Sequence, residues 1–133
     1  MRRFCQRASI VLVSLFLAVT LAHAQNTLFT GTVLEGFVLD KSNKKFPMVV
    51  KIESIDNATG KFIGDVSWSS LNSVHRIEGI LTANTITFKE VSHIKKGGAH
   101  LNCEYAMIIE GNTLDGRWVE PGHNRGIVQL KVK

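Results

Sequence analysis

The sequence predicts an all-β protein, specifically an eight-stranded antiparallel up-and-down barrel, with a β-sandwich as the alternative. Apolar and polar residues alternate with period two through most of the chain after residue 24, and no stretch keeps a helical spacing. Turn residues interrupt this alternation at intervals of roughly 8 to 15 residues. Several connections are too short for the crossovers that parallel strands need, so successive strands are expected to be antiparallel neighbours.

The alternation defines the strands of the first half of the chain in order. Residues predicted on the inner face are Phe29, Val33, Phe37 and Leu39; Met48, Val50, Ile52 and Ser54; Phe62, Gly64, Val66 and Trp68; and Ile77, Gly79 and Leu81. The turn at 56–60 separates the second group from the third, and Ala83-Asn84 follows the fourth. These groups predict the first four strands.

The second half continues the pattern. Its inner-face residues are Ile86 and Phe88; Leu101, Cys103, Tyr105, Met107 and Ile109; Leu114, Gly116 and Trp118; and Val128, Leu130 and Val132. Gly111-Asn112 and Pro121-Gly122 separate the last three groups. Closing the eight strands removes exposed sheet edges, and glycines inside strands suit the bends of a small barrel. We therefore predict the barrel rather than the sandwich.

The chain begins with the features of a secretory signal. Arg2, Arg3 and Arg7 precede the apolar stretch Ile10–Leu21, and a small-x-small cleavage site ends at Ala24. The apolar stretch is shorter than the roughly 20 residues of a spanning helix. An uncleaved membrane anchor is therefore the less favoured alternative.

Cleavage there divides the chain into a signal peptide, 1–24, and a single β-barrel domain, 25–133. The protein is expected to be secreted or periplasmic, with no stable membrane anchor after cleavage. Removal of three arginines leaves 13 of the 16 basic residues against 11 acidic ones. The remaining bases alternate with acids rather than forming a stripe, which disfavours nucleic-acid binding.

One segment of the sequence resembles a known group of barrels. Tyr105, the run from Gly111 to Trp118 and the last strand from Gly126 to Val132 resemble avidin-like and lipocalin-like barrels. They are also similar to small exported bacterial proteins of unassigned function. The resemblance implies a barrel with a mouth and a protein that binds rather than catalyses.

Five residues form the predicted ligand site at this mouth. Trp68, Tyr105 and Trp118 supply aromatic surface with a polar group on each ring. Glu35 and Glu90 are carboxylates that the alternation places on the inner face, where they would orient a ligand. In the alternative reading the aromatics pack the interior and each carboxylate reaches water at a strand end, or pairs with an arginine such as Arg76 or Arg117.

The remaining reactive side chains give weaker signals. Cys103 is the single cysteine after cleavage, and its inner-face position predicts a buried, inert thiol rather than a reactive or intermolecular one. His93, His100 and His123 flank two predicted loops, but their spacing matches no metal-site signature, and we read them as surface residues. No phosphate-binding loop or nucleophile elbow occurs. We therefore expect neither catalysis nor a metal or cofactor.

Together these features predict a small exported binding protein that holds an apolar or aromatic ligand at the barrel mouth. The alternative is a solid barrel that acts through its loops as an interaction or inhibitor module for another exported protein. The loop lysines Lys95 and Lys96 would then carry the interaction. The oligomeric state does not follow from the sequence.

Overall fold

A computed structural model describes residues 28–133, so the predicted signal peptide lies outside the described residues. The strands are β1 (Val33–Leu39), β2 (Lys45–Ile55), β3 (Lys61–Trp68), β4 (Ser73–Leu81), β5 (Thr85–Lys95), β6 (Glu104–Glu110), β7 (Thr113–Glu120) and β8 (Asn124–Val132). A single turn of 3-10 helix, η1 (Ser69–Leu71), joins β3 to β4.

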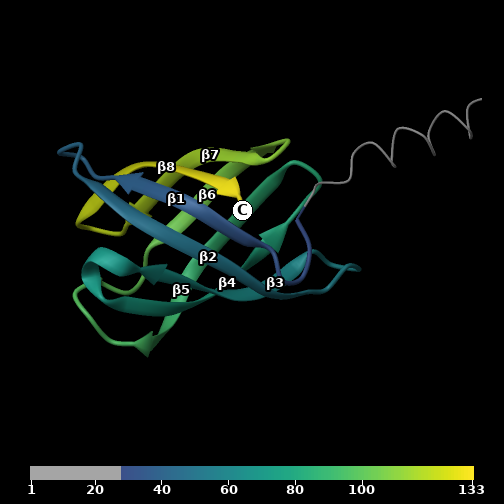
Figure 1. The fold of residues 1–133 in the computed structure, drawn as a ribbon, viewed down its shortest axis with the longest axis horizontal. Helices are drawn as coiled ribbons and strands as arrows, with labels where there is room; N and C mark the ends of the chain where they lie inside the picture. Colours follow the sequence, from purple (N-terminus) through teal and green to yellow (C-terminus); the bar gives the residue numbers. More distant parts are fainter. Residues whose placement is uncertain (1–27) are drawn as a thin grey trace, which may run out of the picture.

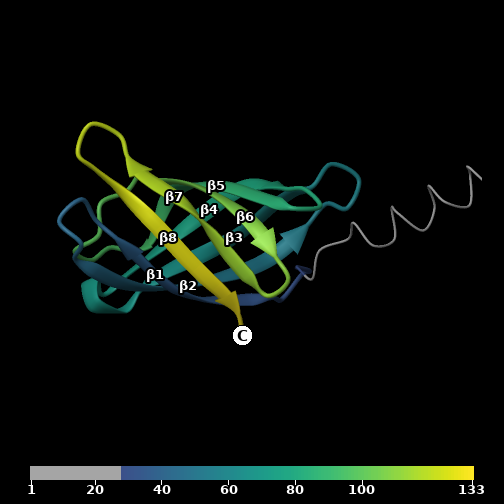
Figure 2. The ribbon, with the colours of Figure 1, turned by 90° about the horizontal axis from the view of Figure 1, so that it is seen from above.

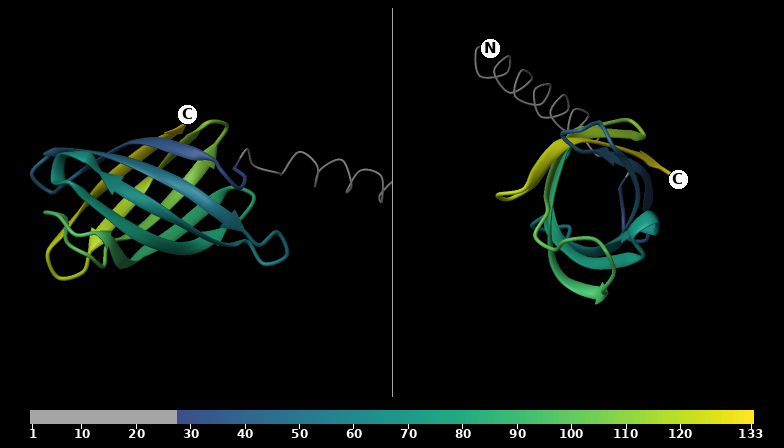
Figure 3. Two further views of the ribbon diagram at one scale, coloured as in Figure 1. Left: turned by 60° about the horizontal axis from the view of Figure 1, so that its bottom comes forward. Right: turned by 90° about the vertical axis from the view of Figure 1, so that its left-hand side faces the viewer.

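The eight strands form one closed barrel in sequence order (Figure 1). Each strand pairs antiparallel with the next, and β1 pairs antiparallel with β8 to close the sheet. Figure 2 shows the strands running obliquely along the long axis, and the end view in Figure 3 shows them arranged as a ring. The predicted up-and-down barrel is confirmed, and the sandwich alternative is wrong.

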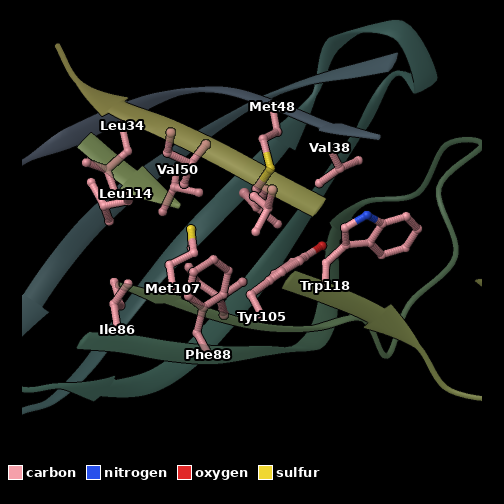
Figure 4. Packing of buried hydrophobic residues seen from close by; sticks show 14 of the residues in the cluster. Leu34, Val38, Met48, Val50, Ile86, Phe88, Tyr105, Met107, Leu114 and Trp118 are labelled. Atoms are coloured by element: carbon pink, nitrogen blue, oxygen red, sulfur yellow. The ribbon is translucent and has the colours of Figure 1, made fainter. Parts of the chain in front are cut away.

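The inward-facing side chains of β2–β8 fill the barrel as the alternation predicts, except at Ser54. Ser54 was expected inside but is exposed, because the pairing of β2 with β3 shifts register between Ile52 and Ser54. Met48, Ile77, Ile86 and Leu114 are at most 1% exposed. In the close view of Figure 4, labelled side chains from several strands converge on one shared interior. The barrel therefore holds its hydrophobic core inside the sheet.

The inner face of the first strand was predicted wrongly. Leu34 and Val38 are the buried residues of β1, whereas Phe29 precedes the strand and is 64% exposed. Large apolar residues occupy both faces of this strand, so alternation alone does not choose between them. Pairing decides, because Leu34 lies opposite the fully buried Val50.

This one-residue shift also moves Glu35 to the outside of the barrel. Its side chain is 49% exposed, and its carboxylate lies 3.2 Å from the ammonium of Lys133. The prediction that Glu35 faces the interior is therefore wrong. Its neighbours on the strand, Leu34 and Gly36, occupy the inner face instead.

One end of the barrel carries η1 and the loops that follow β1, β5 and β7, and we call it the η1 end. Here β5 departs from regular pairing. It pairs with β6 over Thr85–Lys89 alone, and two register shifts against β4 place His93 opposite His75. Bulges of this kind re-aim side chains and bend a strand. The last part of β5 therefore runs beyond its pairing with β6, and the loop 96–103 returns the chain to β6.

Candidate functional site

A buried polar cluster surrounds Glu90 at the η1 end. The Glu90 side chain is 0% exposed. Its Oε2 accepts a hydrogen bond from Trp68 Nε1 at 3.1 Å, and its Oε1 accepts one from the backbone N–H of Cys103 at 3.2 Å. A third contact joins Oε2 to His75 Nδ1 at 2.8 Å. These partners satisfy a carboxylate that would otherwise be costly to bury.

His75 is the member of this cluster that the sequence reasoning missed. It is fully buried on β4, between Ser73 and Ile77 on the inner face. An ionised Glu90 carboxylate can only accept hydrogen bonds, and in that state the contact between His75 and Glu90 requires the imidazole proton on Nδ1. The His75 Nε2 atom and the Tyr105 hydroxyl are buried without a hydrogen-bond partner among the described residues.

Burial changes the acidity of two neighbouring groups. Desolvation raises the pKa of the Tyr105 hydroxyl well above its ordinary value, and the Glu90 carboxylate raises it further. The same two causes, desolvation first, raise the pKa of the Cys103 thiol. Because a thiolate is the reactive form of cysteine, Cys103 is held in its unreactive state. The prediction that Cys103 is buried is confirmed.

The loop 96–103 covers this cluster. The backbone N–H of Gly98 donates to the Leu71 carbonyl at 2.8 Å, and that of Ala99 donates to Ser73 Oγ at 3.0 Å. Ala99 and Ser73 are themselves buried. The loop and η1 therefore close this end of the barrel over Trp68.

The three predicted aromatic site residues all lie inside the barrel. Trp68, Tyr105 and Trp118 are 7% exposed or less. Trp118 Nε1 donates to the Leu39 carbonyl at 2.9 Å, and the Tyr105 ring packs edge-on against Phe88 with ring centroids 4.6 Å apart. Figure 4 shows Tyr105, Phe88 and Trp118 close together among the core side chains. Both indole N–H groups are therefore already used within the protein.

Of the five predicted site residues, four lie inside the barrel toward the η1 end, namely Trp68, Tyr105, Trp118 and Glu90. Glu35 lies outside. Neither suggested arginine pairs with Glu90, since His75 takes that position. Arg76 instead contacts Glu53 on the outer face, with Nη1 2.7 Å from the carboxylate.

The histidines near the loops form two pairs. The ring of His93 packs edge-on against His75, with centroids 4.9 Å apart. His100 lies near His123, with centroids 6.2 Å apart, and its Nδ1 is 2.6 Å from the Glu120 carboxylate. Within residues 28–133, no group of three or more histidine, cysteine, aspartate or glutamate side chains is placed to hold a metal ion.

A groove of about 1120 Å³ lies on the outer face of the barrel, across β3–β8. Along its floor runs an unbroken row of cross-strand neighbours, which are Phe62, Gly79, Phe88, Tyr105, Trp118 and Gly126. The four larger side chains of this row are buried in the core. The row therefore presents backbone rather than side chains to the outside.

Two glycines allow the strands to approach closely along this floor. A Cβ atom on Gly79 would lie 2.0 Å from the Thr87 carbonyl oxygen, and one on Gly126 would lie 1.8 Å from that of Leu39. Both distances are far below contact distance, so no other residue fits without movement of the neighbouring backbone.

The walls of the groove are the residues before and after each floor residue. On β3–β8 in order they are Lys61 and Ile63; Glu78 and Ile80; Thr87 and Lys89; Glu104 and Ala106; Arg117 and Val119; and Arg125 and Ile127. Ile80, Val119 and Ile127 are 47%, 38% and 41% exposed. Val119 and Ile127 lie on the neighbouring strands β7 and β8, whereas Ile80 lies three strands away on β4, so exposed apolar surface occurs at both ends of the groove.

Charge is unevenly distributed along the groove. Lys61 lies at the β3 end opposite Ile80, and in the middle Lys89 lies between Glu78 and Glu104 in the strand register. At the β7–β8 end, Arg117 and Arg125 have apolar cross-strand neighbours. Lys41 joins them there, because its Nζ donates to the His123 carbonyl at 3.3 Å.

Comparison with known proteins adds no relative. The chain matches no protein-family model, no curated protein and no solved structure. The resemblance to avidin-like and lipocalin-like barrels therefore stays a prediction, since a closed eight-stranded barrel alone does not establish a family. No helix in the described part of the chain has the length and apolarity needed to cross a membrane.

Proposed function

We propose that this protein is a non-catalytic, exported binding protein that holds one small molecule with an apolar body in its outer groove. The observation that carries the proposal is the groove itself, whose volume of about 1120 Å³ is large enough for a small molecule and slightly above the usual upper bound of roughly 1000 Å³ for such sites. Export rests on the predicted signal peptide at 1–24. The proposal keeps the ligand class that the sequence suggests and moves the ligand from the barrel mouth to the outer face.

Two features favour the groove over the barrel mouth. The interior aromatics are packed against one another, and their indole N–H groups already bond to Glu90 and to the Leu39 carbonyl. A ligand between Trp68 and Trp118 would have to break these bonds and displace the loop 96–103. The groove instead offers exposed isoleucine and valine side chains without rearrangement.

The proposal is tested with N-phenyl-1-naphthylamine, an uncharged apolar fluorophore. We expect saturable binding of one molecule per chain, weakened about tenfold or more by Ala106→Trp, which fills the groove from β6 without touching the core. Thr113→Trp, on the outer face of β7 but outside the groove, is the matched control and should bind like the wild type.

Two results would contradict the proposal. One is the absence of saturable binding. The other is equal affinity in Ala106→Trp and Thr113→Trp, which would return the ligand to the barrel mouth or to the loops. Interaction with another exported protein through Lys95 and Lys96 stays a prediction, because dye binding in the groove does not measure it.

A further inference from the structure

We propose that the ligand of the outer groove is a single-chain amphiphile with an anionic head, bound with its head at the β7–β8 end and its chain toward β3–β4. This inference rests on the proposed function, since it assigns the chemical class and the orientation of the molecule in that groove. It is carried by the balance of charge along the row of strands: at the β7–β8 end three cations line the groove without a carboxylate, whereas Lys61 and Lys89 share the rest of it with Glu78 and Glu104.

The head would lie against Arg117, Arg125 and Lys41. Among residues 28–133, none of the ion pairs involves these three side chains. Cross-strand pairing puts Arg117 beside Ile127 and Arg125 beside Val119, which keeps the two guanidinium groups on neighbouring strands. Guanidinium groups present paired N–H donors that match carboxylate and phosphate oxygens.

The position of Lys41 is fixed by contacts to the β7–β8 loop. Its backbone N–H donates to Asn124 Oδ1 at 3.3 Å, and its ammonium donates to the His123 carbonyl. Arg125 donates its own backbone N–H to the same Asn124 oxygen at 2.9 Å. One asparagine thus holds the backbone of two of the three cations next to each other at the β7–β8 end.

The chain would begin beside Val119 and Ile127 and run along the groove away from these cations. Ala106 and Thr87 come next along the row and present small side chains, and Ile80 and Ile63 lie at the far end. Neighbouring strands are about 4.8 Å apart, so the path from β8 to β3 is roughly 24 Å long. The two carboxylates in the groove, Glu78 and Glu104, are matched by Lys89 between them and by Lys61 on β3, so the path from β6 to β3 carries no net formal charge.

The test compares four molecules that share a twelve-carbon chain: dodecanoate, dodecyl phosphate, dodecanol and dodecylammonium. Each displaces N-phenyl-1-naphthylamine at pH 8, below its micelle-forming concentration. We expect the two anions to bind about tenfold or more tightly than the alcohol, and the cation most weakly. Raising the salt concentration should shrink the advantage of the anions, because the arginines are exposed.

Variants locate the head group. Arg117→Gln combined with Arg125→Gln should reduce the ratio of anion to alcohol affinity from tenfold to less than about threefold. Arg76→Gln removes an outer-face arginine of β4 that pairs with Glu53 and does not line the groove, so it should keep the wild-type ratio. An equal loss of the ratio in Arg76→Gln would overturn the assignment of the head to the β7–β8 end.

The outcomes separate this inference from the proposed function. Saturable dye binding with equal affinity for dodecanoate and dodecanol would overturn the anionic head and leave the groove as a binding site. Dye binding that none of the four molecules displaces would overturn the single-chain amphiphile. Absence of dye binding would remove the proposed function as well.

Discussion

The inner and outer sides of one cross-strand row have opposite chemistry. Inside, Tyr105 and Trp118 pack beside the buried cluster of Trp68, His75 and Glu90, where most polar atoms bond to one another. Outside, the backbone of the same row forms the floor of a groove whose charged residues are exposed. Trp68, Tyr105, Trp118 and Glu90, which look like ligand-binding residues in the sequence, therefore form part of the core, and the proposed binding surface lies on the other side of the sheet.

The largest effect expected from this comparison is the loss of Glu90. Glu90→Ala removes the acceptor for Trp68 Nε1, His75 Nδ1 and the Cys103 N–H in a site without water access. Breaking a buried pair in this way costs about 3–5 kcal/mol of unfolding free energy. Urea unfolding followed by tryptophan fluorescence measures it.

Two further variants keep this prediction testable. Glu90→Gln retains an acceptor oxygen, so it should lose clearly less unfolding free energy than Glu90→Ala. It should fold even where the alanine variant does not. Glu35→Ala breaks the exposed contact with Lys133 and should cost less than about 1 kcal/mol. Similar losses for Glu35→Ala and Glu90→Ala would contradict the contrast between outside and inside.

The next effect is a dependence on pH caused by Cys103. Its pKa is raised in the folded protein, so the thiol keeps its proton where the unfolded chain, with an ordinary pKa near 8.5, has lost it. This contribution to stability is complete below about pH 8.5 and falls above it, by at most about 1.4 kcal/mol per pH unit. Urea midpoints between pH 7 and 9.5 should therefore decline in the wild type.

Cys103→Ala isolates this contribution. It removes the titrating thiol and should flatten the decline over the same pH range. Parallel curves for the two proteins would show that Cys103 does not titrate on unfolding. Tyr105, whose pKa is also raised, adds its own loss above about pH 10, where unfolded tyrosine ionises.

A smaller effect is expected for the Tyr105 hydroxyl. Tyr105→Phe removes a buried group that has no partner, so stability should stay equal or rise by about 1 kcal/mol. Trp118→Phe is the contrasting variant, because it removes the indole N–H that donates to the Leu39 carbonyl. It should lower the unfolding free energy by about 1 kcal/mol or more. A loss from Tyr105→Phe would mean that the hydroxyl bonds to a bound water or ligand.

The sequence predicts the fold well where one face of a strand is apolar and the other polar. The alternation from Cys103 to Ile109 matches the observed burial residue by residue. It fails in β1, because Val33 and Leu34, on opposite faces, are both apolar and neighbouring strands decide which is buried. Glu35 was misplaced for the same reason.

The candidate site was predictable in part. Alternation places Trp68, Tyr105 and Glu90 inside, and it also places His75 there, two residues before Ile77. The pairing of His75 with Glu90 depends on register shifts between β4 and β5, which the sequence pattern does not reveal. The groove was not predictable, because its floor requires the registers of six strands and the close backbone approach at Gly79.

The smallest expected effect on stability belongs to the groove, and it sharpens the comparison most directly. Ile80→Ser and Val119→Ser alter exposed side chains on the outer face, so each should change the unfolding free energy by less than about 0.5 kcal/mol. Each should nevertheless weaken binding of N-phenyl-1-naphthylamine, because both side chains line the apolar path. Ile108→Ser, which alters another exposed isoleucine on the outer face but outside the groove, should change neither property.

A large stability loss in the groove variants would mean that these side chains support the barrel rather than a ligand. The outer face would then differ from the inner one in exposure but not in role.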